Sequence, residues 1–155
     1  GARLTAATAR ELDVPCTLIT DAMPAFLMQQ GKVDRFICAA DRIALDGHIS
    51  NKVGTYQIAL AARRHGVPFH VLGYDGPDTD TQSGDDIPIE ERAADELFFA
   101  RGVDQESGAQ ARVRTAVNGV DGYYPAFDIT PPDFITAIVT DHGVFPPGEI
   151  GSYFS

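Results

Sequence analysis

A short apolar run at residues 35–40, ended by Asp41, constrains the fold of this chain more than any other segment. The run is bounded by polar residues, which is typical of a buried strand. Apolar residues then recur at helical spacing over residues 53–66, where a basic last turn and a glycine predict the end of a helix. This order predicts a strand followed by a helix, with Asp41 at the end of the strand and Asn51 and Lys52 at the start of the helix.

The same alternation of patterns continues on both sides of this unit. Helices are expected at residues 4–12, 22–30, 52–65, 90–100 and 131–141, and strands at residues 15–20, 35–40, 68–73, 113–117 and 123–128. Residues 74–86 contain five aspartates and predict a solvated loop, and the tail from residue 143 is expected to be irregular. Alternating strands and helices indicate an α/β, Rossmann-like three-layer domain with a mainly parallel sheet.

In an open α/β sheet, ligands bind at the carboxyl ends of the strands, where Asp41 is expected. The free N–H groups of a helix N-terminus, with a lysine such as Lys52 beside them, form a natural seat for a phosphate. A carboxylate and a phosphate seat on one rim indicate proton-transfer chemistry on a small phosphorylated molecule. Of the neighbouring polar residues, Arg42 is expected to pair with Asp41 or the sheet rim, and Asp128 to order the turn before the helix at residue 131.

Composition narrows the possible partners of the 155-residue chain, which has the length of one domain. A formal charge of −10 argues against nucleic acid as a partner. No apolar run reaches the roughly 20 residues of a membrane span, and no signal peptide is recognised, so a cytoplasmic location is expected. Cys16 and Cys38 are expected to be small buried side chains, and neither metal-ligand spacing nor a dinucleotide fingerprint is found, so we expect no metal or cofactor.

Residues 39–56 resemble the signature of methylthioribose-1-phosphate isomerases, which reads close to GADR-(I/V)-A-x-(N)-G-D-x-(A)-N-K-(I/V)-G-T-Y. Four further matches follow the order of the family at residues 1–6, 17–23, 87–92 and 125–131. The same fold is shared by the α, β and δ regulatory subunits of translation factor eIF2B and by ribose-1,5-bisphosphate isomerase. The resemblance extends over nearly the whole chain.

This resemblance implies that residues 1–155 are the C-terminal catalytic domain of a two-domain protein whose helical N-terminal domain is not part of this chain. It implies Asp41 as the proton donor and Asn51 and Lys52 as substrate-binding residues. It further implies a homodimer, contact with the protein's own N-terminal domain, and no cofactor. The expected reaction converts 5-methylthioribose 1-phosphate into 5-methylthioribulose 1-phosphate, a step of methionine salvage.

The chemistry of such a substrate explains why a carboxyl group is needed. Because C1 of an aldose 1-phosphate carries the phosphate, its ring cannot open to a free aldehyde as in ordinary sugar isomerisation. The enzyme must instead open the ring by protonating the ring oxygen. A carboxylic acid that is partly desolvated, with a raised pKa, can donate that proton. We therefore expect Asp41 to be partly desolvated.

Two alternatives remain at this stage. One is an isomerase of a related sugar such as ribose 1,5-bisphosphate, because His48 and Tyr124 depart from the family pattern near the expected site. The other is a non-catalytic regulatory subunit of the eIF2B kind. The presence of Asp41 together with Asn51 and Lys52 favours the enzyme.

Overall fold

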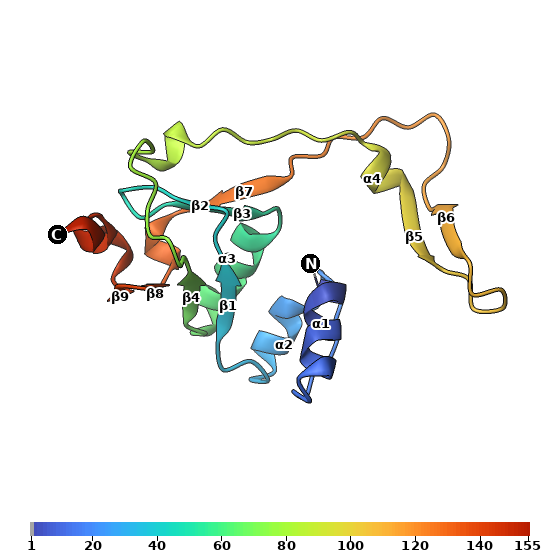
Figure 1. Ribbon diagram of the computed structural model, residues 1–155, viewed down its shortest axis with the longest axis horizontal. Helices are drawn as coiled ribbons and strands as arrows, with labels where there is room; N and C mark the ends of the chain where they lie inside the picture. Colours follow the sequence, from blue (N-terminus) through green and yellow to red (C-terminus); the bar gives the residue numbers. More distant parts are fainter. Residues whose placement is uncertain (1) are drawn as a thin grey trace.

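The computed structural model describes residues 2–155, which build an α/β fold around two small sheets (Figure 1). Sheet A has the order β1-β4-β8-β9, with β1 (Phe36–Ala39), β4 (Phe69–Leu72) and β8 (Ala137–Thr140) parallel and β9 (Gly143–Phe145) antiparallel at one edge. The predicted α/β, Rossmann-like class with a mainly parallel sheet is confirmed.

A second, antiparallel sheet forms the side of the molecule that carries the predicted site. Sheet B has the order β2-β3-β7, built from β2 (Arg42–Ile43), β3 (Ile49–Lys52) and β7 (Phe127–Thr130). β2 follows β1 after only Ala40 and Asp41, so the two sheets are joined directly at Asp41. The sequence patterns did not predict this sheet.

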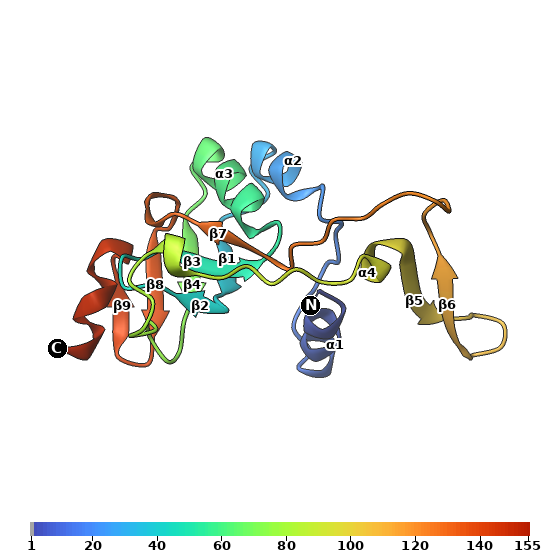
Figure 2. The same cartoon turned by 90° about the horizontal axis from the view of Figure 1, so that it is seen from above.

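Helices α2 (Pro24–Gln29) and α3 (Thr55–His65) lie on the same side of sheet A (Figure 2). Met28, Ala62 and Val67 form a small buried cluster between them. The main core gathers apolar side chains from both sheets, among them Ile49, Phe69, Val71, Ile138 and Ile150. Ile150 belongs to a C-terminal 3-10 helix, η3 (Pro147–Phe154), so the tail that was expected to be irregular is ordered and closes this core.

The remaining elements belong to neither sheet A nor sheet B. Helix α1 (Ala2–Glu11) comes first, and the 3-10 helix η1 (Gly84–Asp86) follows β4. α4 (Asp95–Phe98) and the hairpin of β5 (Phe99–Val103) and β6 (Gln110–Arg114) then extend away from both sheets (Figures 1 and 2). The predicted helix over residues 90–100 is therefore limited to α4, and the strand predicted at residues 113–117 overlaps β6 only at Val113 and Arg114.

The strand predicted at residues 15–20 is not formed. These residues have no ladder partner among the described strands, and Cys16 and Leu18 are exposed. An extended segment needs a neighbouring strand to pair its backbone N–H and C=O groups. The apolar character of the segment alone was therefore not enough to make it a strand. The expectation that Cys16 is buried is wrong as well.

The helix predicted at residues 131–141 is also wrong. A short 3-10 helix, η2 (Pro132–Phe134), is followed by β8, whose residues pair with β4. Ile138 at the centre of β8 is fully buried between its neighbours in the core. A short apolar run does not distinguish a buried strand from a helix, and here pairing with β4 decided the outcome.

The long helix after Lys52 begins later than predicted, at Thr55. Asn51 and Lys52 belong to β3, where they pair with Asp128 and Phe127 of β7. Gly54 has a φ of 103°, a conformation that favours glycine, and it separates the strand from the helix. Within residues 2–155, no helix has the length and apolar character needed to cross a membrane.

Candidate functional site

Asp41 lies where β1 ends and β2 begins. Its backbone N–H donates to the carbonyl oxygen of Ser50 at 2.8 Å, which places it beside Asn51 on β3. The two segments that were expected to share a rim are therefore adjacent in space. The Asp41 side chain is exposed, so the partial desolvation expected for it is not found in this chain.

Asn51 is half-buried and points toward the interface of β1 and α3. Its Nδ2 donates to Oγ1 of Thr55 at 3.1 Å, and its side chain also hydrogen-bonds the Cys38 thiol. Burial raises the pKa of that thiol to about 12, so Cys38 is a protonated, unreactive thiol near neutral pH. The Asn51 amide thus connects β1, β3 and the first turn of α3.

Lys52 is exposed and lies on the opposite face of β3 from Asn51, as strand alternation requires. Its Nζ is 4.4 Å from the ring centroid of Phe127, its cross-strand partner, in a cation–π contact. Glu90 accepts two hydrogen bonds from Arg92, at 3.1 and 3.2 Å, and these chiefly hold the pKa of its carboxyl below the usual value. The charge of Lys52 acts on this pKa in the same direction, so Glu90 lies near both cations.

Asp128 of β7 caps the start of α3. Its carboxylate accepts hydrogen bonds from the backbone N–H of Gly54 at 2.7 Å and of Tyr56 at 3.1 and 3.2 Å. Two of the free N–H groups expected to receive a phosphate are therefore already satisfied. Asp128 was expected only to order its own local turn, and nothing local to it in the sequence signals a partner 74 residues away.

A pocket of about 490 Å³ opens at this end of α3. It is lined by Arg3, Asp21, Lys52, Val53, Gly54, Thr55, Gln57 and Ile58. Lys52 and Arg3 supply two cationic groups, which makes one part of the pocket suited to an anion such as a phosphate. Asp41 does not line the pocket, although its backbone is held next to β3.

Two other residues near Asp41 have structural partners. Arg42 pairs with Asp78 at 2.9 Å and donates to Oγ1 of Thr81 at 3.2 Å, so it holds the aspartate-rich loop and not Asp41. The His48 ring contacts the Asp46 carboxylate at 2.9 Å. No group of three His, Cys, Asp or Glu side chains is arranged for a metal in the described part of the chain.

The chain is similar to known proteins over most of its length. Residues 1–147 match the family model described as "Initiation factor 2 subunit family". A methylthioribose-1-phosphate isomerase of Thermus thermophilus is 45% identical over 149 residues, which cover 95% of this chain and 42% of the relative. That of Chloroflexus aurantiacus is 45% identical over 148 residues, covering 95% of this chain and 40% of the relative.

Solved structures of related proteins resemble this chain in both fold and sequence. The 5-methylthioribose 1-phosphate isomerase of Pyrococcus horikoshii OT3 superposes with a TM-score of 0.84 at 40% identity, covering 99% of this chain and 41% of that one. The translation initiation factor eIF-2B subunit delta of A. fulgidus has a TM-score of 0.81 at 38% identity, covering 95% and 40%. The chain spans less than half the length of these relatives.

Proposed function

Because the chain belongs to the initiation factor 2 subunit family, we propose that the complete protein is an aldose–ketose isomerase with 5-methylthioribose 1-phosphate as substrate and 5-methylthioribulose 1-phosphate as product. This chain would be its C-terminal half, and a preceding N-terminal domain would contribute the rest of the pocket. The observation that carries the proposal is the pairing of β2 with β3, which brings Asp41 next to Asn51 and Lys52. The names of the two isomerases at 45% identity support the choice of substrate.

In the proposed mechanism, Asp41 in its acid form protonates the ring oxygen of the sugar, which allows the ring to open while C1 keeps its phosphate. A hydrogen then moves between C2 and C1 to give the ketose. Lys52 binds the phosphate, and Asn51 fixes the turn from β3 into α3. Since Asp41 is exposed in this chain, closure by the N-terminal domain would supply the desolvation that its acid form needs.

A second candidate is a non-catalytic regulatory subunit. It is favoured by the similarity to the eIF-2B subunit delta of A. fulgidus, at 38% identity. The two functions differ in what the protein must bind, because only the isomerase requires a sugar phosphate in the pocket beside Lys52. Calorimetric titration of the complete protein with the sugar phosphate separates them, and absence of binding would favour the regulatory function.

The test of the catalytic proposal uses Asp41→Asn in the complete protein. This change keeps the size of the side chain but removes the acidic proton, so turnover should fall by at least ~10²-fold while substrate binding persists. Lys52→Ala should instead weaken substrate binding first, seen as a higher KM.

Asp34→Asn and Lys32→Ala are the matched controls, because both residues are exposed and lie outside the pocket. Both controls should keep normal kinetics. Near-normal turnover of Asp41→Asn would remove Asp41 from its role as proton donor.

A further inference from the structure

Two parts of the chain beside Lys52 have no role in the proposed chemistry, namely the segment at residues 90–92 and the ring of Phe127. The segment runs antiparallel to residues 124–126, through an isolated bridge and two backbone hydrogen bonds of 2.8 and 2.9 Å. The next residues of the chain form β7, which pairs with β3 on its other side. The fold therefore brings residues 90–92 close to Lys52, which is far from them in the sequence.

The ring of Phe127 orients the ammonium group of Lys52. Nζ lies 4.4 Å from the ring centroid, and the two residues are cross-strand partners. Within residues 2–155 the lysine has no carboxylate at ion-pair distance, although Asp21 lines the same pocket. An aromatic ring attracts a cation without neutralising its charge. The ammonium group consequently keeps its full charge for an anion in the pocket.

Glu90 is a carboxylate that could pair with Lys52 and does not. Both of its oxygens are occupied by Arg92, whose Nε donates to Oε1 at 3.1 Å and whose Nη2 donates to Oε2 at 3.2 Å. These hydrogen bonds chiefly lower the pKa of Glu90, and the positive charge of Lys52 lowers that pKa further. The lysine is thus near enough to act on Glu90, while Arg92 holds the carboxylate.

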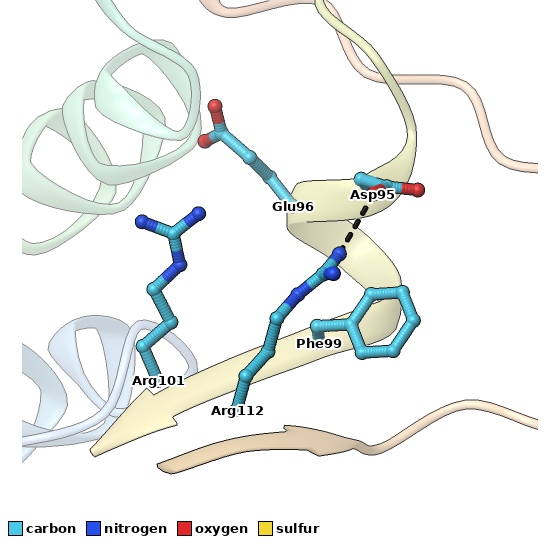
Figure 3. A pocket seen from close by; sticks show the side chains of 5 residues that line it. All are labelled: Asp95, Glu96, Phe99, Arg101 and Arg112. Carbon is cyan, nitrogen blue, oxygen red and sulfur yellow. Dashed lines mark hydrogen bonds and ion pairs between the residues drawn. The ribbon is translucent and has the colours of Figure 1, made fainter. Parts of the chain in front are cut away.

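Arg92 is itself fixed by further contacts. Its Nη1 lies 3.9 Å from Oε1 of Glu96 on α4, and its guanidinium carbon is 5.9 Å from the centroid of Phe127. Glu96 is available to Arg92 because the neighbouring Arg112 pairs with Asp95 instead, at 2.7 Å. Figure 3 shows Glu96 pointing away from that pair. The guanidinium of Arg92 is therefore kept where it meets Glu90.

We propose that Phe127 and Arg92 are positioning residues for Lys52. The ring of Phe127 holds the ammonium group at the pocket, and Arg92 occupies Glu90 so that this carboxylate does not pair with the lysine. This inference rests on the proposed function, in which Lys52 binds the phosphate of the substrate. A phosphate then meets a lysine that is already oriented and still charged.

The role of the ring is tested with Phe127→Leu in the complete protein and 5-methylthioribose 1-phosphate as substrate. KM should rise roughly 3- to 10-fold with little change in kcat, because the cation–π contact is lost and the proton donor is untouched. Phe127→Tyr, which keeps the ring, should bind the substrate more tightly than Phe127→Leu. In a Lys52→Ala background, Phe127→Leu should raise KM no further.

The role of Arg92 is tested with Arg92→Met, which leaves Glu90 free to pair with Lys52. KM should rise roughly 3- to 5-fold, the effect of one exposed ion pair that competes with the phosphate. Adding Glu90→Gln removes the competing carboxylate and should bring KM back to within about 2-fold of wild type. A purely structural role of Arg92 predicts the opposite, because the double variant would then be no better than Arg92→Met.

Nuclear magnetic resonance of the complete protein labelled with ¹³C-lysine follows Lys52 without any substrate. Its signal is the one that disappears in Lys52→Arg. The ring should shift the Cε protons of Lys52 upfield in the wild type, and Phe127→Leu should abolish this shift. Phe134→Leu is the matched control, since that half-buried ring lies 4.8 Å from the Arg63 guanidinium and outside the pocket. It should change neither KM nor the Lys52 signal.

An unshifted Lys52 signal in the wild type, or a normal KM in Phe127→Leu, would overturn the role of Phe127. A double variant of Glu90 and Arg92 that binds no better than Arg92→Met would overturn the role of Arg92. Failure of the proposed function looks different. In that case the wild type turns over no sugar phosphate, while an upfield shift that Phe127→Leu abolishes still supports the positioning of Lys52.

Discussion

Asp128 illustrates how one carboxylate can serve two distant parts of the chain. It belongs to β7, pairs in register with Asn51 of β3, and caps α3 through the N–H groups of Gly54 and Tyr56. Burial raises the pKa of its carboxyl, and the two N–H donors offset only part of that rise. The residue therefore holds the start of α3 against β7 at some cost in desolvation.

We expect Asp128→Ala to lower the free energy of unfolding by about 1–2 kcal/mol, because the helix loses its cap. Urea unfolding followed by circular dichroism measures this loss. Asp34→Ala, at an exposed position, is the control and should change stability little. An Asp128→Ala protein as stable as the control would mean that the cap contributes nothing.

The pH dependence of Asp128 follows from the sign of its shift. A carboxyl whose pKa is higher in the folded state binds more protons there than in the unfolded state, so stability falls as the pH rises through the folded pKa. Asp128→Asn cannot titrate. The stability of this variant relative to wild type should thus improve as the pH rises from about 3 to 7.

At the scale of elements, the boundary between β3 and α3 decides where Lys52 points. β3 ends at Lys52, and Gly54 adopts a positive φ of 103° before α3 begins at Thr55. A side chain at Gly54 would meet no atom within 4 Å, so the position requires glycine only because of its backbone conformation. The lysine is presented to the pocket by a strand and not by a helix.

Gly54→Ala should therefore destabilise the protein by about 1–2 kcal/mol through backbone strain alone. Gly102→Ala is a matched control, since Gly102 lies in β5 with open space around it and no positive φ. The control is expected to be neutral or slightly stabilising. Thermal unfolding of the two variants compares them directly, and equal melting temperatures would refute a strained Gly54.

At the scale of the whole molecule, stability is centred on sheet A. β4 lies between β1 and β8, and its Phe69 and Val71 are almost fully buried. The Phe69 ring also stacks on Phe36 of β1 with centroids 4.2 Å apart. Residues 15–20, in contrast, are exposed and belong to no strand.

Hydrogen exchange should reflect this difference. The amides of β4 should be the slowest to exchange, whereas those of residues 16–20 should exchange rapidly, because they lack ladder hydrogen bonds. Mass spectrometry of exchanged peptides from this chain measures both. Protection at residues 16–20 equal to that of β4 would show that the segment is paired after all.

Local patterns in the sequence predicted part of the fold correctly. The apolar run at residues 35–40 and the glycine at position 66 sufficed to predict β1, the end of α3 and the α/β class. The resemblance in residues 39–56 also indicated the family. Asp41, Asn51 and Lys52 were candidates for the same reason, and their roles remain predictions.

The tertiary structure decided everything that depends on pairing between distant segments. Residues 137–140 form the strand β8 because β4 lies beside them as a ladder partner. Residues 15–20 form no strand, because none of the described strands lies beside them as a partner. The tertiary structure also placed Lys52 on β3 and the cap of α3 on Asp128, through the register between β3 and β7. A strand satisfies its backbone groups only through another segment, so its formation cannot be settled by its own residues.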